Sequence, residues 1–568
     1  MINFSRVKNW SIYIWIIFFT IFHGRVYFAT GVPITHDGEN HLARFANYKV
    51  ALKEGQLPPR FAPNLVNHYG YPVFNYNYPL ANILSVPFSV LKIHYELTFK
   101  IIMLVFVAAG LAGIATWLRL LSYGQQAQAF GVAIFALSPY LFNALVFRGN
   151  VGEVMALGLL PWLIVGIEVI RQRSVSRGEL IVLIMTWTAF LLSHNVTVVF
   201  GVPLVLGYGL LRVGTAYNYW KVIGTCIVTA VGATLWFWLP ALAEKSQIIV
   251  DTAAASLTFA DHFPTLKQLI LAPLTFGYSY LGSVDSLSYA MGSLQILTVL
   301  IALLLITKNR WISKQYAEQN KVFIVALSGL VVLFLLQLSL AKPLWTLIPV
   351  LRFIQFPWRL GLFSPLLLAP VAAEIWQRLP RKGHALLILA TAAQLFSMLI
   401  IKPVGYLHQE KLTYEQFTQS TSTANENLPK TFTYTDFSDW LPTAEIVEGK
   451  GRVEVIKWSG SERTYRVFVD EKVTVIEPTM YFLGWQTTAQ RGHDVWRQQL
   501  PYLITQQWGG RIAYQLDPGE YLVRSQFTQQ TPARLVGNSV SLATVIGMIL
   551  YATWPVVKKY VLVKYSKR

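Results

Sequence analysis

Long apolar runs separated by short polar turns dominate the chain. The first run, at about 10–29, follows Arg6 and Lys8. We interpret it as a retained membrane helix, with a cleaved signal peptide as the alternative. Eleven further runs approach the roughly 20 residues that a helix needs to cross a bilayer. They lie at about 98–119, 127–146, 154–170, 179–193, 196–212, 221–242, 293–307, 322–340, 360–376, 384–401 and 537–557. The pattern predicts an α-helical polytopic membrane protein with about twelve transmembrane helices.

The region 402–535 has a different pattern, in which apolar and polar residues alternate as they do in β-strands. The alternating runs at 452–458, 465–469, 472–476 and 521–524 are separated by turn residues such as Ser459-Gly460 and Pro518-Gly519. This pattern is typical of a small antiparallel β-sandwich. We therefore expect a transmembrane domain (1–402) with outer loops at 30–97 and 243–291, a β-rich domain (403–535), and a final transmembrane helix with a basic tail (536–568).

Composition agrees with a membrane protein and narrows its partners. The chain is 54% hydrophobic and only 13% charged, whereas soluble domains carry about 25% charged residues. The net charge of +19 would suit nucleic acid, but in a polytopic protein it is better explained by Lys and Arg on the cytoplasmic side. The single cysteine, Cys226, forms neither an intrachain disulfide nor a cysteine-based metal site.

The basic clusters predict the orientation of the chain. Clusters at 171–177, 308–314, 378–382 and 558–568 all fall on the same side as Arg6 and Lys8 if the helix count is right. The positive-inside rule then places both termini in the cytoplasm. We expect the protein to lie in the inner (cytoplasmic) membrane. The β-rich domain and the polar outer loops are expected on the extracytoplasmic side.

The stretch 35–44, just after the first apolar run, is the first candidate for chemistry. If a helix begins after Gly38, then Asp37, His41 and Arg44 lie on one face at spacings of four and seven. A carboxylate, an imidazole and a guanidinium on one face suit proton transfer beside a phosphate. The alternative is that Asp37 only caps a surface helix, with Glu39 solvated beside it.

Two outer turns carry further candidates. Arg148 and Glu153 flank two glycines and could bind phosphate, a metal or a sugar hydroxyl, or simply pair with each other at the membrane rim. His194 and Asn195 lie in a tight turn between two apolar runs. A histidine there could donate to a phosphate oxygen, although it is more often a satisfied polar turn residue.

The segment 352–359 places two arginines among aromatic residues at the mouth of a predicted helix. Arg352, Gln355 and Arg359 would suit bidentate phosphate binding. The alternative is interface anchoring by aromatic and arginine side chains. The sequence contains no Walker loop, dinucleotide fingerprint or HExxH pattern. The predicted spans are almost free of acidic residues, which argues against a proton-coupled transporter.

These features together resemble the GT-C glycosyltransferases, in which an acidic residue follows the first helix and another lies in the second outer loop. The chain is more closely similar to bacterial membrane proteins described as pyruvoyl-tetrahydropterin-synthase-related. The matching pieces are Asp37…His41…Arg44 and the stretches 75–79, 193–195, 355–359, 481–485 and 518–521. The pterin part of that description does not fit, because no pattern here supplies the three-histidine zinc site of such a synthase.

The resemblance implies a glycosyltransferase that takes a sugar from a polyprenyl-phosphate donor and inverts its anomeric centre. The acceptor would be an envelope glycan, lipid or protein, and membrane lipids rather than nucleic acid would be the other partners. Asp37 would be the general base. The residues implied in substrate or phosphate binding are Glu39, His41, Arg44, Arg148, Glu153, His194, Asn195, Arg352, Gln355 and Arg359.

Metal dependence is left open by the resemblance. Some members bind a divalent metal (Mg, Mn or Ca), for which Asp37 and Glu153 would be the ligands here, but the outer loops contain no Asp-x-Asp pair. Two other functions also remain open. The chain could be a flippase or exporter of lipid-linked saccharides, or a non-catalytic envelope scaffold whose β-domain binds glycan through its tryptophans.

Overall fold

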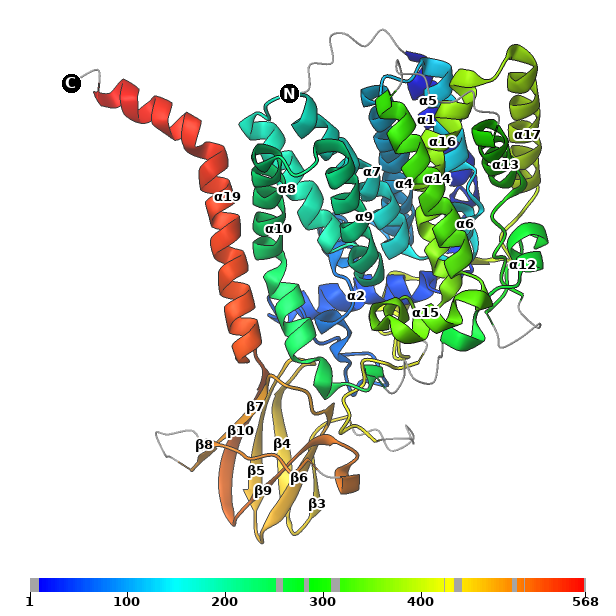
Figure 1. Cartoon of the computed structure of the whole chain (residues 1–568). Helices are drawn as coiled ribbons and strands as arrows, with labels where there is room; N and C mark the ends of the chain where they lie inside the picture. The colour runs from blue at the N-terminus through cyan, green and yellow to red at the C-terminus, as the bar shows by residue number, and fades with distance from the viewer. Residues whose placement is uncertain are drawn as a thin grey trace.

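The computed structural model describes residues 10–251, 259–279, 286–307, 317–422, 424–433, 442–492, 498–504 and 506–565. Figure 1 shows a helical bundle with a unit of β-strands at one end. The basic cluster predicted at 308–314 and the last three residues of the basic tail lie outside the described residues.

The bundle helices run roughly side by side (Figure 1). They are α1 (Trp10–Gly24), α4 (Tyr95–Leu120), α5 (Gln125–Ala136), α7 (Val151–Gln172), α8 (Arg177–Leu191), α9 (Asn195–Val213), α10 (Tyr217–Ala243), α13 (Ser293–Thr307), α14 (Ala317–Leu336), α16 (Ser364–Arg378), α17 (Arg381–Leu399) and α19 (Pro532–Tyr565). Each apolar run of the sequence therefore falls on a helix.

Among the described residues, fewer helices reach spanning length than the roughly twelve that the sequence predicts. Within the described residues, eight helices are long and apolar enough to cross a bilayer, and a bent pair at 125–136 and 139–148 makes a ninth. Helices α1 and α8 have 15 residues each, which corresponds to about 22 Å of helix against a hydrocarbon core of about 30 Å. The prediction of a multi-pass membrane protein is confirmed.

Shorter elements connect the bundle helices and the strands. Helix α2 (Gly38–Lys53) lies across the end of the bundle that faces the β-strands in Figure 1. The other short elements are α3 (Leu80–Val90), α6 (Pro139–Asn143), α12 (Leu266–Leu271), α15 (Lys342–Leu347) and α18 (Lys411–Glu415), with helical turns η2 (Arg25–Tyr27), η3 (Pro72–Asn75), η4 (Ala144–Arg148), η5 (Lys245–Gln247), η6 (Phe259–Asp261), η9 (Ser339–Ala341), η10 (Pro349–Ile354), η11 (Pro357–Phe363) and η13 (Gln506–Trp508).

The β-strands form two antiparallel sheets, of order β4-β5-β10-β7-β8 and β3-β6-β9. Their bounds are β3 (Glu445–Glu448), β4 (Gly451–Trp458), β5 (Glu462–Val469), β6 (Val473–Met480), β7 (Trp485–Arg491), β8 (Gln498–Gln499), β9 (Arg511–Leu516) and β10 (Gly519–Phe527). Val467 and Val523 from one sheet share a buried core with Val475 and Tyr514 from the other. The predicted antiparallel sandwich is confirmed.

The residues between α17 and the sandwich cover the outer loop rather than the sheets. Strand β2 (Tyr406–Leu407) pairs with β1 (Val32–Pro33) just before the Asp37 stretch. The Glu415 carboxylate accepts hydrogen bonds from Lys49 and from the Tyr95 hydroxyl. The segment between α17 and the sandwich therefore helps to hold α2 in position.

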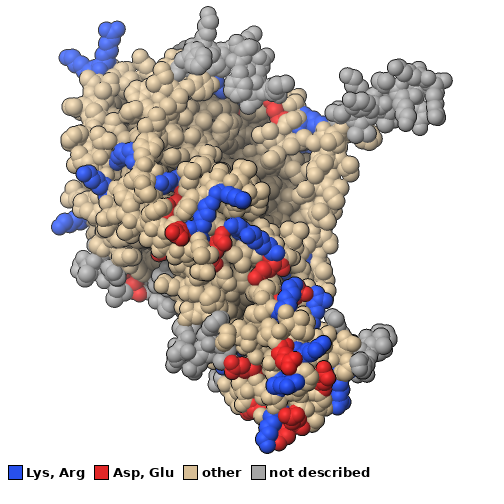
Figure 2. All heavy atoms as spheres, turned by 180° about the vertical axis from the view of Figure 1, so that it is seen from behind, with Lys and Arg blue, Asp and Glu red and all other residues tan. Residues whose placement is uncertain are grey.

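A buried polar joint connects the segment between α2 and α3 with the end of α10 and the start of α19. The Arg534 guanidinium lies 2.8 Å from the Glu244 carboxylate, and the side chain of Arg60 donates to Asn75 and Asn538. Both arginines are fully buried. On the face in Figure 2, charged side chains gather over the sheets and the loops next to them.

Candidate active site

The loop before α2 is docked on the turn that ends with Arg148. The backbone N–H groups of His36 and Asp37 donate to the carbonyls of Phe147 and Arg148, at 3.1 and 2.9 Å. Gly149 adopts a left-handed conformation with φ of 60°, and a Cβ there would lie 2.2 Å from the Thr35 hydroxyl. A glycine at this position therefore lets two loops, far apart in sequence, meet.

Asp37 precedes the first turn of α2, as the sequence predicts, but its side chain does not cap the helix. Its carbonyl accepts from the His41 N–H, while its carboxylate makes no capping hydrogen bond. This carboxylate is partly exposed and forms no hydrogen bond or ion pair with the described residues. It interacts electrostatically with Arg148 and Arg359. An unpaired carboxylate next to two guanidinium groups is available for proton transfer.

Arg148 and Glu153 form a buried bidentate ion pair. The guanidinium nitrogens lie 2.5 and 2.8 Å from the two carboxylate oxygens, and the Tyr140 hydroxyl donates to Glu153 at 2.8 Å. Arg359 approaches the same carboxylate at 3.8 Å, and the aromatic rings of Phe356 and Trp358 lie against its guanidinium. Two arginines thus share the Glu153 carboxylate, so Arg359 brings a positive charge that Glu153 alone does not balance.

His194 is packed against this cluster as the N-cap of α9. Its Nδ1 accepts from the Thr197 N–H at 3.3 Å, and its ring meets that of Tyr78 edge-on at 5.0 Å. A Cβ on Gly152 would lie 2.6 Å from Tyr78 and 2.9 Å from His194, so only glycine admits both rings there. Burial lowers the pKa of His194 to about 4. The imidazole is therefore a neutral hydrogen-bond donor rather than a cation at neutral pH.

The remaining polar residues of α2 are occupied by structural contacts. His41 is buried, with its Nε2 3.5 Å from the Tyr78 hydroxyl, and burial holds its pKa well below the usual range. Arg44 donates to the hydroxyl and carbonyl of Thr421. Glu39 accepts from Gln409 at 3.4 Å. Of these three, only His41 directly contacts a residue that touches His194.

The arginines of the segment 352–359 are separated by the fold. Arg359 joins the cluster, and its guanidinium donates to Gln355 Oε1 at 2.7 Å. Arg352 is exposed and donates to the carbonyls of Trp345 and Thr346 instead. The segment is built of η10 and η11 with Gln355 at φ of 66° between them, so the two arginines do not share a face. Asn195 donates to the Tyr76 carbonyl.

An apolar groove of about 420 Å³ reaches η11, the helical turn that also carries Arg359. It runs between α9 on one side and α14, η11 and α16 on the other, and none of the described residues that line it is charged. Along α9 it extends from Phe200 to Leu211, about 16 Å. At its outer end Leu360 lines the groove, and Leu360 directly follows Arg359. The groove has the shape and polarity for a hydrocarbon chain.

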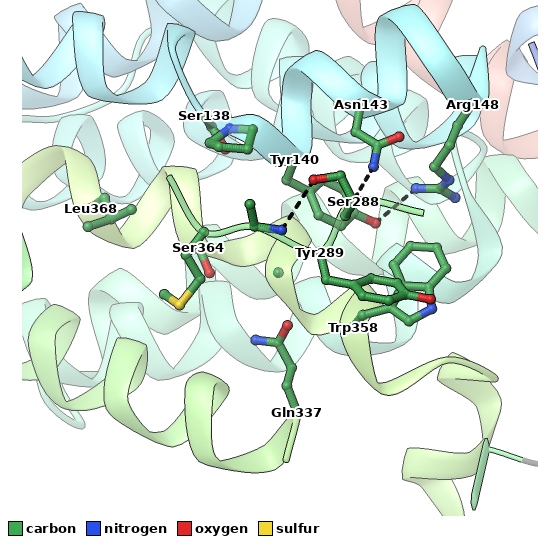
Figure 3. Close-up of a pocket in the computed structure, with 14 residues that line it drawn as sticks. Ser138, Tyr140, Asn143, Arg148, Ser288, Tyr289, Gln337, Trp358, Ser364 and Leu368 are labelled. Carbon is green, nitrogen blue, oxygen red and sulfur yellow. Dashed lines mark hydrogen bonds between the residues drawn. The ribbon is translucent and has the colours of Figure 1, made fainter. Parts of the chain in front are cut away.

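A second, smaller cavity is lined in part by Arg148 (Figure 3). It has a volume of about 40 Å³ and is lined by hydroxyl, amide and aromatic groups. In Figure 3, Arg148 and Tyr140 point toward one another at one end, and Gln337 enters from the opposite side. Tyr140 therefore stands between this cavity and Glu153, to which it donates.

The helical architecture agrees with a known family of membrane proteins. The family described as "6-pyruvoyl-tetrahydropterin synthase related domain; membrane protein" matches residues 74–407, more than half of the chain. The chain belongs to this family. The match includes Arg148, Glu153, His194 and Arg359 and begins after Asp37.

Individual relatives are more distant. An uncharacterized protein from Lactococcus lactis subsp. cremoris is 24% identical over 261 residues, which are 44% of this chain and 42% of that protein. The cryo-EM structure of the mycobacterial arabinofuranosyltransferase AftD is similar with a TM-score of 0.44 and 16% identity, over 69% of this chain and 26% of AftD. A mutant AftD structure gives a TM-score of 0.45, 15% identity, and 68% and 28% coverage. The chain spans less than half of each of these proteins.

The cluster of this family member does not suit a metal ion. In the described part of the chain, no group of three or more His, Cys, Asp or Glu side chains could hold one. Both Glu153 oxygens are engaged by Arg148, and the nearby Arg359 would repel a cation. The metal that the resemblance allowed at Asp37 and Glu153 therefore does not fit these residues.

Three aromatic members of the site are absent from the predicted set. Tyr78 and Tyr140 bring hydroxyls to His41 and Glu153, and Trp358 packs under Arg148 with 5.0 Å between its ring and the guanidinium. Tyr78 and Trp358 lie in stretches that the resemblance did single out. Tyr140 follows a proline inside an apolar run, where it looks like an ordinary core residue.

Proposed function

We propose that the chain is a GT-C-type glycosyltransferase that moves a sugar from a polyprenyl-phosphate donor to an extracytoplasmic acceptor. The observation that carries the proposal is the junction of three features: an uncharged groove, an arginine cluster at its outer end, and an unpaired carboxylate beside that cluster. A lipid-linked phosphate needs the first two, and activation of an acceptor hydroxyl needs the third.

The groove would hold the isoprenoid chain of the donor. Its lining is almost entirely apolar, so a hydrocarbon chain there gives up no hydrogen bonds and gains contacts with Phe200, Leu336 and Leu360. The phosphate at the head of such a lipid would lie beside Arg359. Arg359 is bound to Glu153 less tightly than Arg148 is. Arg148 forms a bidentate ion pair with Glu153, whereas Arg359 lies 3.8 Å from that carboxylate.

The reaction we infer is a single displacement at the anomeric carbon. The acceptor oxygen forms a bond to that carbon as its proton passes to the Asp37 carboxylate. The bond from the anomeric carbon to the phosphate oxygen breaks, and its electron pair stays on the phosphate. Fixed positive charge beside the departing phosphate stabilises the transition state. One base and one leaving group on opposite faces of the sugar invert the anomeric centre.

The other cluster residues have supporting roles in this proposal. The Arg148 carbonyl holds the Asp37 loop by accepting from the Asp37 N–H, and the Glu153 carboxylate that Arg148 binds would orient Arg359. The neutral His194 would donate a hydrogen bond rather than carry charge. Arg352 has no role, because its guanidinium is bound to carbonyls away from the cluster.

The test is sugar transfer by the Asp37→Asn variant reconstituted in liposomes with labelled polyprenyl-phosphate-linked sugars. We expect a loss of transfer of about 100-fold or more, with unchanged melting temperature and unchanged recovery of bound polyprenyl lipid by mass spectrometry. The exposed Asp470→Asn variant on the sandwich is the control and should retain activity. Full transfer by Asp37→Asn would refute the base assignment.

The same assay separates the enzyme from a lipid-linked saccharide flippase. The groove lining contains no charged side chain in its described residues, so a sugar headgroup would cross the bilayer without polar partners. A flippase would move labelled donor between leaflets without acceptor, and Asp37→Asn would leave that movement intact. A non-catalytic glycan-binding protein would instead bind the acceptor without consuming the donor.

A further inference from the structure

The cavity beside Arg148 is built of polar groups although it lies among the membrane helices. Its walls come from the break between α5 and α6, the segment 288–291, the end of α14, η11 and α16. Hydroxyl groups of Ser138, Ser288 and Ser364 and the amides of Asn143 and Gln337 line it. Polar side chains in a low-dielectric interior are costly unless something hydrogen-bonds to them.

Two of these polar groups lack partners. Asn143 donates through Nδ2 to the Ser288 carbonyl, but its Oδ1 has no partner among the described residues. The indole Nε1 of Trp358 likewise has no hydrogen-bond partner in the described part of the chain. Both side chains are more than nine-tenths buried, at 6% and 7% exposure. Asn143 and Trp358 both line this small cavity, and the unpartnered atom of each is buried within its wall.

Aromatic rings complete the lining. The Trp358 ring lies 5.7 Å from Tyr289, is stacked on Phe356, and has the Arg148 guanidinium 5.0 Å above it. Tyr140 faces the cavity from α6 and shares its hydroxyl with Arg148 and Glu153. An apolar aromatic surface combined with a few hydroxyl and amide groups is the chemistry that recognises a carbohydrate, which has apolar C–H faces and hydroxyl edges.

The size of the cavity limits what it can take. A volume of about 40 Å³ admits roughly three water-sized groups. A whole sugar ring does not fit, but a hydroxymethyl group or a pair of hydroxyls at one edge of a ring does. In the absence of a sugar, water would occupy such a polar space.

We propose that this cavity is a sugar-edge subsite, which reads the hydroxyl groups of the transferred sugar on the side away from Asp37. The inference rests on the proposed glycosyl transfer for the identity of its ligand. Arg148 and Tyr140 connect the two places: they line the cavity and also bind Glu153 at the reaction cluster. A donor sugar that spans the reaction cluster and the cavity would place its anomeric carbon toward the cluster and its distal hydroxyls in the cavity.

The test fills or neutralises the cavity and measures binding in the Asp37→Asn background, where bound donor is not consumed. Gly361→Ala adds a Cβ 3.1 Å from Tyr140 Cδ2 and 3.6 Å from Gln337 Oε1. Gln337→Leu removes the amide at similar volume. Probes are polyprenyl-phosphate-linked hexose, its 6-deoxy analogue and a pentose, each quantified by native mass spectrometry. Gly224→Ala, with no atom within 4 Å of its added Cβ, is the control.

We expect both cavity variants to change the ratio of hexose to deoxy-sugar binding by about tenfold or more, and the control to leave it unchanged. An equal loss for all three donors, no change for any, or no binding of the panel by the parent protein would overturn the inference. Loss of transfer in Asp37→Asn with an unchanged binding ratio in the cavity variants would refute the subsite alone. Retained transfer in Asp37→Asn with a changed ratio would refute only the base.

Discussion

At the scale of single residues, burial sets the protonation of the histidines beside the cluster. His194 and His41 lie within the packed outer surface of the bundle, and both have pKa values below the ordinary value for histidine because their charged forms lose hydration. Arg44 and His194 add to this effect at His41. The site therefore has its positive charge on arginines, whose charge does not change with pH in the working range.

The low pKa of His194 makes the folding stability depend on pH. The pKa of His194 is about 4 in the folded chain and about 6.5 when unfolded. Between these values the unfolded chain binds a proton that the folded chain does not, so folding stability falls as the pH drops from 6.5 to about 4. Above pH 6.5 the protonation of His194 no longer affects the folding stability.

We predict that His194→Gln flattens the loss of stability in that window. The difference amounts to on the order of 3 kcal/mol over the whole window for the pKa change quoted. Melting temperatures of purified protein in detergent, taken between pH 7 and pH 4, would measure it. Identical pH profiles for the variant and the parent would show that His194 is not buried as a neutral imidazole.

At the scale of elements, the site depends on the docking of the loop before α2 on the turn before α7. The turn contains η4, a single π-helical turn, followed by Gly149 in the left-handed region. Such π-turns are common at functional sites. Together they direct the carbonyls of Phe147 and Arg148 toward His36 and Asp37.

We predict that Gly149→Ala undocks the Asp37 loop. The added Cβ would lie 2.2 Å from Thr35 Oγ1 and 3.1 Å from the Gly38 nitrogen, so the backbone must move. We expect transfer activity to fall about 100-fold or more, since a displacement of about 1 Å at a catalytic group has that effect. Liposome transfer assays and proteolysis of the 30–40 loop would measure both effects.

The matched control is Gly55→Ala. Gly55 also has positive φ, at 87°, but no atom lies within 4 Å of an added Cβ. It should show only the backbone strain, about 1 kcal/mol, and full activity. Equal activity losses in the two variants would mean that backbone strain, rather than the contact with Thr35, is responsible.

The sequence predicts those elements whose pattern reflects burial and misses the ones whose position depends on contacts. The helices of the bundle and strands β4, β5, β6 and β10 follow from apolar runs and alternation. Strand β7 has the polar sequence Trp-Gln-Thr-Thr-Ala-Gln-Arg, in which only alternate side chains are buried, and is missed. Arg352 is misplaced for a related reason, because the irregular backbone at Gln355 cannot be read from residue spacing.

At the scale of the whole molecule, the candidate site and the sandwich lie toward the same end of the bundle. The sandwich, α2 and the Arg148 turn are at the end where α1 finishes and α19 begins, and α19 leads away from the sheets along the bundle (Figure 1). The basic residues Arg171, Arg173 and Arg177 lie at the other end, between α7 and α8. The positive-inside rule then favours a cytoplasmic location for that end and an extracytoplasmic one for the cluster.

The chain offers a direct way to test this orientation, because its single cysteine, Cys226, is buried in α10. In a Cys226→Ser background, Glu454→Cys places a thiol on strand β4 and Arg173→Cys places one between α7 and α8. The native side chains are 50% and 49% exposed, so the two thiols are matched in accessibility. We predict that a membrane-impermeant maleimide labels residue 454 in right-side-out vesicles at once and labels residue 173 only after the membrane is opened. The reverse order would place the cluster in the cytoplasm, where a donor sugar would have to be carried by a cytoplasmic-leaflet lipid and the acceptor could not be an outer envelope component.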